Sequence, residues 1–337
     1  MFMLICGLLL AHMPYKVLVI PGDGIGPEVV EAAMYVVNAA AAKFGVELEV
    51  KTAEAGDAAL RKYGVAMPPE TLKLADAADV IFKGPIGESA YDVTSLIRMR
   101  YTLYANIRPV KDLPGVPAVK PIDCVFVREN VEDVYVGAEY KVGDVAIALK
   151  VITGQGTRRV ARVARRYAEA RKRRVTIVHK ANVLRVVDGF FRDVALEELR
   201  GLEVDQMYVD AAAMELVRNP SRFDVVLTTN QYGDILTDLA AQVAGGIGLA
   251  PSGNIGDNKA MFEPVHGAAF DIAGKGVANP IATILSAAMM FEWLGRRDAA
   301  EAIRAAVEKS IEAGYKTPDI GGKYSTKEVG KYIASIL

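Results

Sequence analysis

KVLVIPGDGIGPEVV, residues 16–30, joins an apolar run to a glycine turn and then to the start of a helical pattern. The same order opens the α/β folds that bind dinucleotides, whose fingerprint places glycines at positions one, three and six. Gly22 and Gly24 meet the first two requirements, but position six is Pro27, and the remaining glycine, Gly26, is at position five. Proline suits the first turn of a helix, where its missing N–H costs nothing. The stretch therefore predicts a strand, a turn and a helix without the fingerprint, so that any nucleotide must be held by other residues.

Short apolar strands alternate with alanine-rich helical patterns along the rest of the chain. This alternation predicts an α/β fold with a large, mostly parallel sheet flanked by helices. Residues 131–153 differ, because β-branched residues and tyrosine surround a glycine turn, and they predict hairpin strands that form a protruding arm. We expect strands at 16–20, 78–84, 124–130, 175–180 and 223–230, and helices at 27–44, 69–77, 157–174, 233–244, 279–295 and 297–313.

The composition narrows the class of protein. A chain of 337 residues has room for one large or two ordinary domains, and its net charge of −1 gives no general attraction for nucleic acid or membranes. The two cysteines, Cys6 and Cys124, form at most one bridge, which is typical of a reducing compartment and favours a cytoplasmic protein. The opening MFMLICGLLLAHM lacks a basic leader and is too short to span a bilayer, so we expect translation to start at Met13, with a signal peptide as the alternative.

Two aspartates stand four residues apart in QYGDILTDLAA, residues 231–241. On a helix, Asp234 and Asp238 lie on one face and repel by roughly a few tenths of a kcal/mol unless a cation lies between them. Carboxylates with waters and a substrate oxygen suit octahedral Mg²⁺ or Mn²⁺, which makes a metal site one explanation. A solvated acidic face is the other.

Basic residues recur at the ends of the expected strands. In TIVHKAN, residues 176–182, Lys180 ends a buried strand and is followed by Asn182. A desolvated lysine has a lowered pKa and can act as a base, whereas a lysine that reaches solvent at the sheet edge has no such role. Three guanidinium groups that converge would clamp a small dicarboxylate, and separate surface positions are the alternative. The candidates are Arg98, Arg108 and Arg128.

The loop FEPVHGAAFDIAGKGVANP, residues 262–280, is punctuated by glycines and contains His266, Asp271 and Asn279. Small residues permit close approach and an acid accepts from a ribose diol, so the composition fits an adenosine, although the pattern alone is not specific. The arginine-rich stretch 157–174 has apolar residues at helical spacing, so we expect one face to be buried and the arginines to be solvated. No aromatic residues are interleaved with the arginines, which argues against nucleic-acid binding.

Taken in the order in which they stand in the chain, these stretches and a few further motifs resemble the β-decarboxylating dehydrogenases that act on 3-isopropylmalate, isocitrate and homoisocitrate. The resemblance implies the fold of that family, which lacks the usual fingerprint and places the cofactor against the loop at 263–279. It implies a large cofactor-side domain of residues 1–103 and 246–337, and a smaller substrate and dimerisation domain of residues 104–245. The motifs, between about Lys16 and Leu337, are PGDGIGPE, LYANIRPVK, VRENVEDVY, HKANV, MYVDAAAM, NQYGDILTDLAA, EPVHGAAFDIAG and ANP.

The resemblance also implies a role for each matching residue. Arg98, Arg108 and Arg128 would bind the carboxylates of a malate. The partner subunit's Lys180 would be the base for the C2 hydroxyl, and Tyr135 would protonate the enol that remains after decarboxylation.

A divalent ion, Mg²⁺ or Mn²⁺, would lie between Asp234, Asp238 and the partner subunit's Asp210, and NAD would accept the hydride. Because each site would take residues from two chains, the resemblance implies a homodimer with an inactive monomer. The implied cofactor contacts are Glu263, His266, Gly267, Asp271, Ile272, Asn279 and Asn182.

The choice of coenzyme and substrate can be argued further. Asp271 stands where NAD users of the family place an acid, and Ile272 offers no cation for a 2′-phosphate, so NAD is preferred over NADP. In ESAYDVTSLIR, residues 88–98, Thr94 and Ser95 replace the leucines expected in 3-isopropylmalate enzymes. The side chains with which isocitrate and homoisocitrate enzymes bind a substrate carboxylate from this segment are absent as well. Val93, Leu96 and Ile97 are expected to offer an apolar wall.

That wall favours 3-isopropylmalate, with homoisocitrate, isocitrate and tartrate-like malates as alternatives, because apolar pockets discriminate only modestly. An alternative of a different class is a catalytically silent regulatory subunit. Such a chain would be expected to lose Lys180, Tyr135 or an aspartate, and all of them are present.

Overall fold

The computed structural model describes residues 13–90 and 92–337. The expectations about translation start and about Cys6 fall outside these ranges. Within them, none of the helices combines the length and the apolar character that a membrane span requires.

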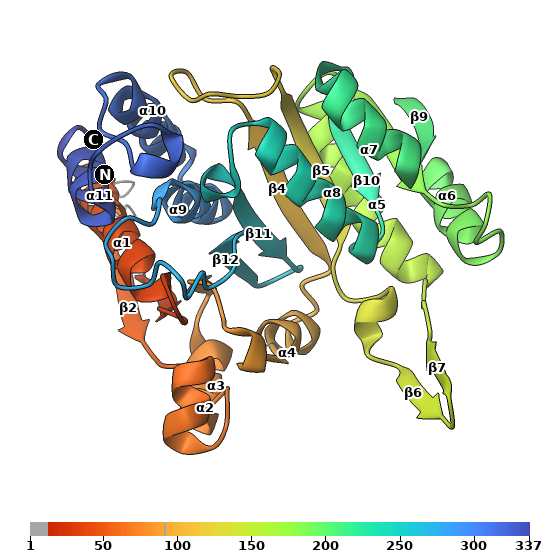
Figure 1. Cartoon of the computed structure of the whole chain (residues 1–337), viewed down its shortest axis with the longest axis horizontal. Helices are drawn as coiled ribbons and strands as arrows, with labels where there is room; N and C mark the ends of the chain where they lie inside the picture. The colour runs from red at the N-terminus through yellow and green to blue at the C-terminus, as the bar shows by residue number, and fades with distance from the viewer. Residues whose placement is uncertain (1–12, 91) are drawn as a thin grey trace, which may run out of the picture.

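A ten-stranded sheet runs through the molecule in the order β2-β1-β3-β12-β11-β4-β5-β10-β8-β9 (Figure 1). It is mostly parallel, as predicted, but β11 is antiparallel to β12 and β4, and β4 is antiparallel to β5. Two parallel halves that run in opposite directions therefore meet at an antiparallel centre, which the sequence pattern did not predict. The strands are β1 (Tyr15–Ile20), β2 (Leu48–Thr52), β3 (Val80–Lys83), β4 (Ala105–Lys111), β5 (Asp123–Glu129), β8 (Arg174–His179), β9 (Glu203–Tyr208), β10 (Val225–Thr228), β11 (Pro251–Ile255) and β12 (Ala260–Pro264).

Eight of the eleven helices in the described residues flank the sheet in two groups. Figure 1 shows α1, α9, α10 and α11 at one end of the sheet and α5 to α8 at the other. Each of the six predicted helices is confirmed, with shifts of up to five residues at their ends. The helices are α1 (Gly26–Phe44), α2 (Asp57–Tyr63), α3 (Pro69–Ala77), α4 (Asp92–Arg100), α5 (Gly154–Glu169), α6 (Val187–Glu198), α7 (Val209–Arg218), α8 (Asn230–Val243), α9 (Ile281–Trp293), α10 (Arg297–Glu312) and α11 (Thr326–Ser335).

Helix α5 shows the largest of these shifts. It begins three residues early because the hydroxyl of Thr153 caps it, accepting a hydrogen bond from the backbone N–H of Gly156 at 3.0 Å. It ends at Glu169, and Arg173 beyond it has a φ of 62°, which no helix accommodates. Its apolar face is buried as predicted, with Val160 and Val163 in the core and the arginines outward.

The glycine turn after β1 owes its composition to packing within the chain. A Cβ on Gly22 would lie 2.0 Å from the Pro85 carbonyl oxygen, and one on Gly24 would lie 1.9 Å from that of Ala268. Both have positive φ, 78° and 56°, which glycine adopts without strain. The Ile25 N–H donates to the Ala268 carbonyl at 2.8 Å. The turn therefore supports the loop at 263–279, which explains why its glycines do not follow the nucleotide fingerprint.

The predicted arm is a two-stranded hairpin of β6 (Glu139–Val142) and β7 (Val145–Ala148) that extends away from the body (Figure 1). Every residue of both strands is exposed, including Val142, Val145 and Ile147. An isolated hairpin is at best marginally stable in water, so this arm needs a further surface to cover it.

Candidate active site

Three buried arginines come from three different elements. Arg98 lies on α4, Arg108 on β4 and Arg128 on β5, and their side chains are between 1% and 11% exposed. Arg108 and Arg128 both form ion pairs with Asp234, the former at 3.4 Å. Burial and the nearby charge of Arg128 lower the pKa of Arg108 to about 10, with Arg98 acting in the same direction. The structure thus brings the three predicted guanidinium groups into one cluster.

Neutral side chains hold two of these arginines in place. The Asn106 side-chain oxygen accepts from Arg108 Nε at 2.8 Å, and the Thr237 hydroxyl accepts from Arg108 Nη1 at 2.6 Å. Asn230 Oδ1 accepts from Arg128 Nε and Nη2 at 2.9 and 2.6 Å. Asn106 and Asn230 were not among the residues predicted from the sequence. Asn106 could have been found, because it stands two residues before Arg108 on the same face of a strand.

Helix α8 approaches β5 closely enough to place its aspartates beside the arginines. A Cβ on Gly233 would lie 2.5 Å from Arg128 Cγ, so only glycine fits there. The next residue, Asp234, accepts hydrogen bonds on both oxygens, from Arg128 on Oδ1 and from the Tyr135 hydroxyl on Oδ2 at 2.7 Å. Burial would raise the pKa of Asp234, but Arg128 and Arg108 outweigh it and hold the pKa below its ordinary value.

Asp238 lies one turn further along α8, with its side chain 54% exposed and 3.5 Å from Arg108 Nη1. Burial raises the pKa of this carboxyl more than Arg108 lowers it, and the charge of Asp234 adds to the rise. Both aspartates contact Arg108, so they share one face, and this guanidinium offsets part of their repulsion. Their half-exposed carboxylate oxygens suit Mg²⁺ or Mn²⁺.

The other predicted catalytic and metal residues form a separate pair. Lys180 follows β8, and its Nζ donates to Asp210 Oδ1 at 2.5 Å. This hydrogen bond lowers the pKa of Asp210, whose side chain is 64% exposed. Among residues 13–90 and 92–337, no three His, Cys, Asp or Glu side chains gather as a metal site would require. One chain therefore unites Lys180 with Asp210, and Asp234 with Asp238, but it does not unite the two pairs.

Several residues of the loop at 263–279 have polar groups or free space that suit a ligand. His266 is buried, and burial lowers its pKa and favours the neutral ring; within the described part of the chain its Nε2 has no hydrogen-bond partner. A Cβ on Gly267 would have no neighbour within 4 Å, and Asp271 is exposed. These features fit a nucleotide that passes along the loop. Ile272 instead packs against the cluster around Ile25.

The remaining predicted cofactor residues differ in their surroundings. Asn279 donates to Asp319 Oδ2 at 3.0 Å, while Asn182 is exposed two residues after Lys180. Glu263 lies within a buried network, 2.6 Å from Lys83 Nζ and 3.3 Å from Arg98 Nη2.

Burial would raise the pKa of Glu263, but the charges of Lys83 and Arg98 and hydrogen bonds from Lys83 and Asn254 hold it at about 2. Lys83 was not among the predicted site residues, although it stands next to the end of the expected strand at 78–84.

The expected apolar wall of the substrate pocket is wrong for two of its three residues. Val93 and Ile97 are 1% and 0% exposed and belong to the core beneath α4, while Leu96 is 40% exposed. Thr94 and Ser95 are half-buried and stand four and three residues before Arg98, which places them on its side of the helix. The face of α4 that includes Arg98 is therefore polar.

Comparison with known proteins identifies the family. The model of the isocitrate/isopropylmalate dehydrogenase family matches residues 16–333. The chain is 49% identical to the 3-isopropylmalate dehydrogenase of Saccharolobus solfataricus, covering 94% of this chain and 98% of that protein. It is 45% identical to the homoisocitrate dehydrogenase of Methanocaldococcus jannaschii, covering 96% and 97%. The crystal structure of isocitrate dehydrogenase from Methylococcus capsulatus superposes with a TM-score of 0.91 at 41% identity, covering 96% and 99%. This chain is a member of the isocitrate/isopropylmalate dehydrogenase family.

Proposed function

We propose that the chain catalyses the NAD-dependent oxidative decarboxylation of 3-isopropylmalate to 2-oxo-4-methylpentanoate, the reaction of leucine biosynthesis, with Mg²⁺ or Mn²⁺. The observation that carries the proposal is the cluster of Arg98, Arg108 and Arg128 beside Asp234. Three buried cations next to one aspartate suit a small dicarboxylate, because bidentate arginine pairing recognises carboxylates strongly. Four relatives named 3-isopropylmalate dehydrogenase, at 47–49% identity, support this substrate.

Different residues of the chain bind the substrate, accept a proton and donate a proton. The three arginines hold the carboxylates and fix the orientation of the malate. The Nζ of Lys180 takes the proton of the C2 hydroxyl, and the Tyr135 hydroxyl returns a proton to C3 once CO₂ has left. When bound, the divalent ion would polarise the C2 oxygen and the nicotinamide would accept the hydride from C2.

We propose that the active unit is a homodimer whose sites each combine two chains. Asp234 and Asp238 supply only two metal ligands, and Lys180 with Asp210 lies elsewhere in the same chain. Exposed apolar residues on α7 and α8, such as Met214 and Ile235, together with the arm, offer the surface for a second copy.

The division into two domains is also part of this proposal. Its cofactor side comprises residues 1–103 and 246–337, and its substrate and dimerisation side comprises residues 104–245. We also propose a cytoplasmic location, which the sparse use of cysteine supports.

Steady-state kinetics test the substrate. We expect NADH formation with Mg²⁺ to have the highest kcat/KM for 3-isopropylmalate among 3-isopropylmalate, homoisocitrate, isocitrate and tartrate. Because Thr94 and Ser95 are polar, we expect Thr94→Leu with Ser95→Leu to raise the preference for 3-isopropylmalate further. A higher kcat/KM for homoisocitrate or isocitrate would reassign the substrate. Absence of turnover with all four would favour the silent subunit instead.

A further inference from the structure

A second cavity lies on the face of the sheet opposite the candidate active site. Successive residues of a strand point to opposite faces. On β4, Arg108 faces the active site and Ile107 lines this cavity. On β12, Glu263 faces the active site and Phe262 lines the cavity. The cavity has a volume of about 300 Å³. It is therefore separate from the active site and independent of the function proposed for it.

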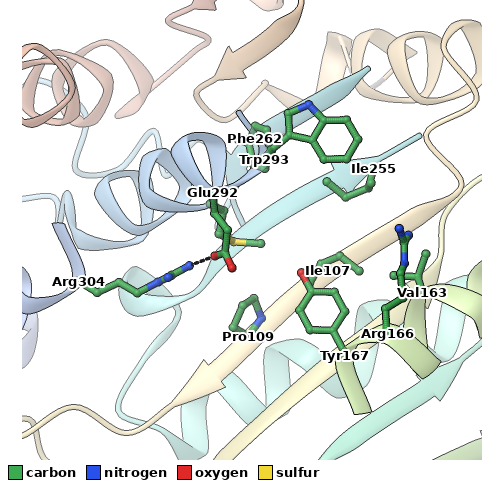
Figure 2. Close-up of a pocket in the computed structure, with 11 residues that line it drawn as sticks. Ile107, Pro109, Val163, Arg166, Tyr167, Ile255, Phe262, Glu292, Trp293 and Arg304 are labelled. Atoms are coloured by element: carbon green, nitrogen blue, oxygen red, sulfur yellow. Dashed lines mark hydrogen bonds and ion pairs between the residues drawn. The ribbon is translucent and has the colours of Figure 1, made fainter. Parts of the chain in front are cut away.

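The walls of this cavity are mainly apolar and aromatic, and they come from both ends of the sheet (Figure 2). Tyr167 of α5 lies on one side, and Trp293, at the end of α9, lies on the other. An ion pair between Glu292 and Arg304 stands at its border, as Figure 2 shows. A flat, uncharged ring system suits such walls.

An adjoining groove of about 630 Å³ is strongly basic, and Arg166 lines both spaces. Three acidic side chains lie near its arginines, and all three are engaged. Glu169 is 3.3 Å from Arg165 Nη1. Glu198 is within 3.8 Å of Arg158 and 3.2 Å of Arg162, and Asp257 accepts from the Tyr104 hydroxyl at 2.9 Å. The arginines that line the groove are Arg158, Arg159, Arg162, Arg165 and Arg166.

Two of these cations are not neutralised within the described part of the chain. No acidic side chain there comes within 4.0 Å of Arg159 or Arg166, the limit for an ion pair. The guanidinium of Arg159 lies 4.8 Å from the centre of the Tyr104 ring, which holds it beside the groove. Arg162 is three residues from Arg159 and four from Arg166, and like charges at these helical spacings repel one another. A multivalent anion would relieve this repulsion.

We propose that the two spaces together bind a nucleoside polyphosphate. Its phosphates would lie on the arginines of α5, and its base would enter the apolar cavity beside Trp293. The volumes match those of small-molecule sites, and arginine is the side chain best suited to phosphate oxygens.

Trp293 is the only tryptophan of the chain, so its fluorescence reports on the apolar cavity. ATP without added metal is the probe. We expect a saturable change in Trp293 emission, and a Kd at least tenfold higher in the Arg159→Ala, Arg162→Ala double variant. The single variant Arg166→Glu, at an exposed position, should weaken binding similarly without a packing change. Arg61→Ala on α2 removes an exposed arginine that lines neither space and should leave the Kd unchanged.

Two further ligands test the contribution of the phosphates and that of the base to binding separately. Inorganic tripolyphosphate should compete with ATP, and adenosine should bind far more weakly than ATP. The proposal is overturned if ATP leaves Trp293 emission unchanged, if tripolyphosphate does not compete, or if both groove variants bind ATP like the unmodified protein. The last result would place ATP elsewhere, such as at the loop 263–279. No part of this experiment depends on turnover of a malate.

Discussion

Arg128 and Asp234, 106 positions apart in the chain, form an ion pair in which the arginine side chain is 1% exposed and the aspartate 42% exposed. The pair joins the two functions expected of the site, because Arg128 is a proposed carboxylate ligand and Asp234 a proposed metal ligand. In the protein without ligands, the charge of each side chain is balanced by the charge of the other. A dicarboxylate that draws Arg128 toward itself would release an oxygen of Asp234 for a metal.

We therefore expect substrate and metal to bind cooperatively. Calorimetric titration with Mg²⁺ should give an affinity about tenfold higher when 3-isopropylmalate is present, a coupling of about 1.4 kcal/mol. Chelation of divalent ions should abolish NADH formation, and added Mn²⁺ should restore it. Equal Mg²⁺ affinities with and without the malate would contradict the coupling, and full turnover of the chelated enzyme would contradict the metal itself.

The close approach of α8 to β5 can be tested at Gly233. Gly233→Ala would place a Cβ 2.5 Å from Arg128 Cγ, so we expect destabilisation of about 1–3 kcal/mol and a lower kcat/KM as Arg128 is displaced. The measurements are chemical denaturation and steady-state kinetics. Gly189→Ala is the matched control, because it is also a helical glycine and its nearest neighbour to a Cβ is 3.9 Å away. If both variants behave alike, steric contact with Arg128 is not what requires Gly233.

The network around Glu263 makes stability depend on pH. Its pKa of about 2 lies below the ordinary value of 4.5, so its ionised form stabilises the fold above about pH 4.5, and this contribution disappears as the pH falls toward 2. Glu263→Gln leaves Lys83 and Arg98 buried without their anion, and we expect it to cost about 3–5 kcal/mol at neutral pH. Denaturation of both proteins between about pH 7 and pH 3 should show the difference shrinking in acid. A difference independent of pH would contradict this role of the carboxylate.

Asp271 should control the choice between NAD and NADP. Asp271→Lys replaces an exposed anion by a cation, and we expect the ratio of kcat/KM for NADP to that for NAD to rise at least about tenfold, since a 2′-phosphate then meets attraction in place of repulsion. Ile272 stays unchanged because it packs against the cluster around Ile25. Glu301→Lys makes the same charge change on the exposed side of α10 and should not alter the ratio. An unaltered ratio in Asp271→Lys would refute the assignment.

The sequence predicted five strands on either side of the centre of the sheet, but neither its edge strands β2 and β9 nor its central strands β12, β11 and β4. Strands β1, β3, β5, β8 and β10 are nearly uninterrupted apolar runs, as expected for strands buried on both faces. The central strands β4 and β11 carry Asn106, Arg108 and Asn254 toward the site, and these polar residues hide the strand pattern. Two of the elements that build the site, β4 and β11, were thus ones that hydrophobic patterning could not detect, whereas β5 and α8 were predicted.

Site residues could be predicted where their residue type is unusual for their position in the sequence. They could not be predicted where their role depends on a partner that is far away in the chain. Arg128 and Lys180 stand out at strand ends, but Lys83 looks ordinary until Glu263, 180 positions later, is placed beside it. Val93 and Ile97 were assigned to the substrate pocket because sequence alone does not show which side of α4 meets the core. That Asp210 lies away from Asp234 within one chain likewise becomes visible only in the folded structure.

The central claim is that each active site combines Asp234 of one chain with Lys180 and Asp210 of another. Mixing two inactive variants tests it most directly. Lys180→Ala and Asp234→Asn chains, unfolded together and refolded as a mixture, should recover about one quarter of the activity of the unmodified protein, because half of randomly formed dimers are hybrids with one intact site each. Each variant refolded alone should stay inactive. A refolded mixture that contains hybrid dimers by mass spectrometry and yet remains inactive would contradict the shared site.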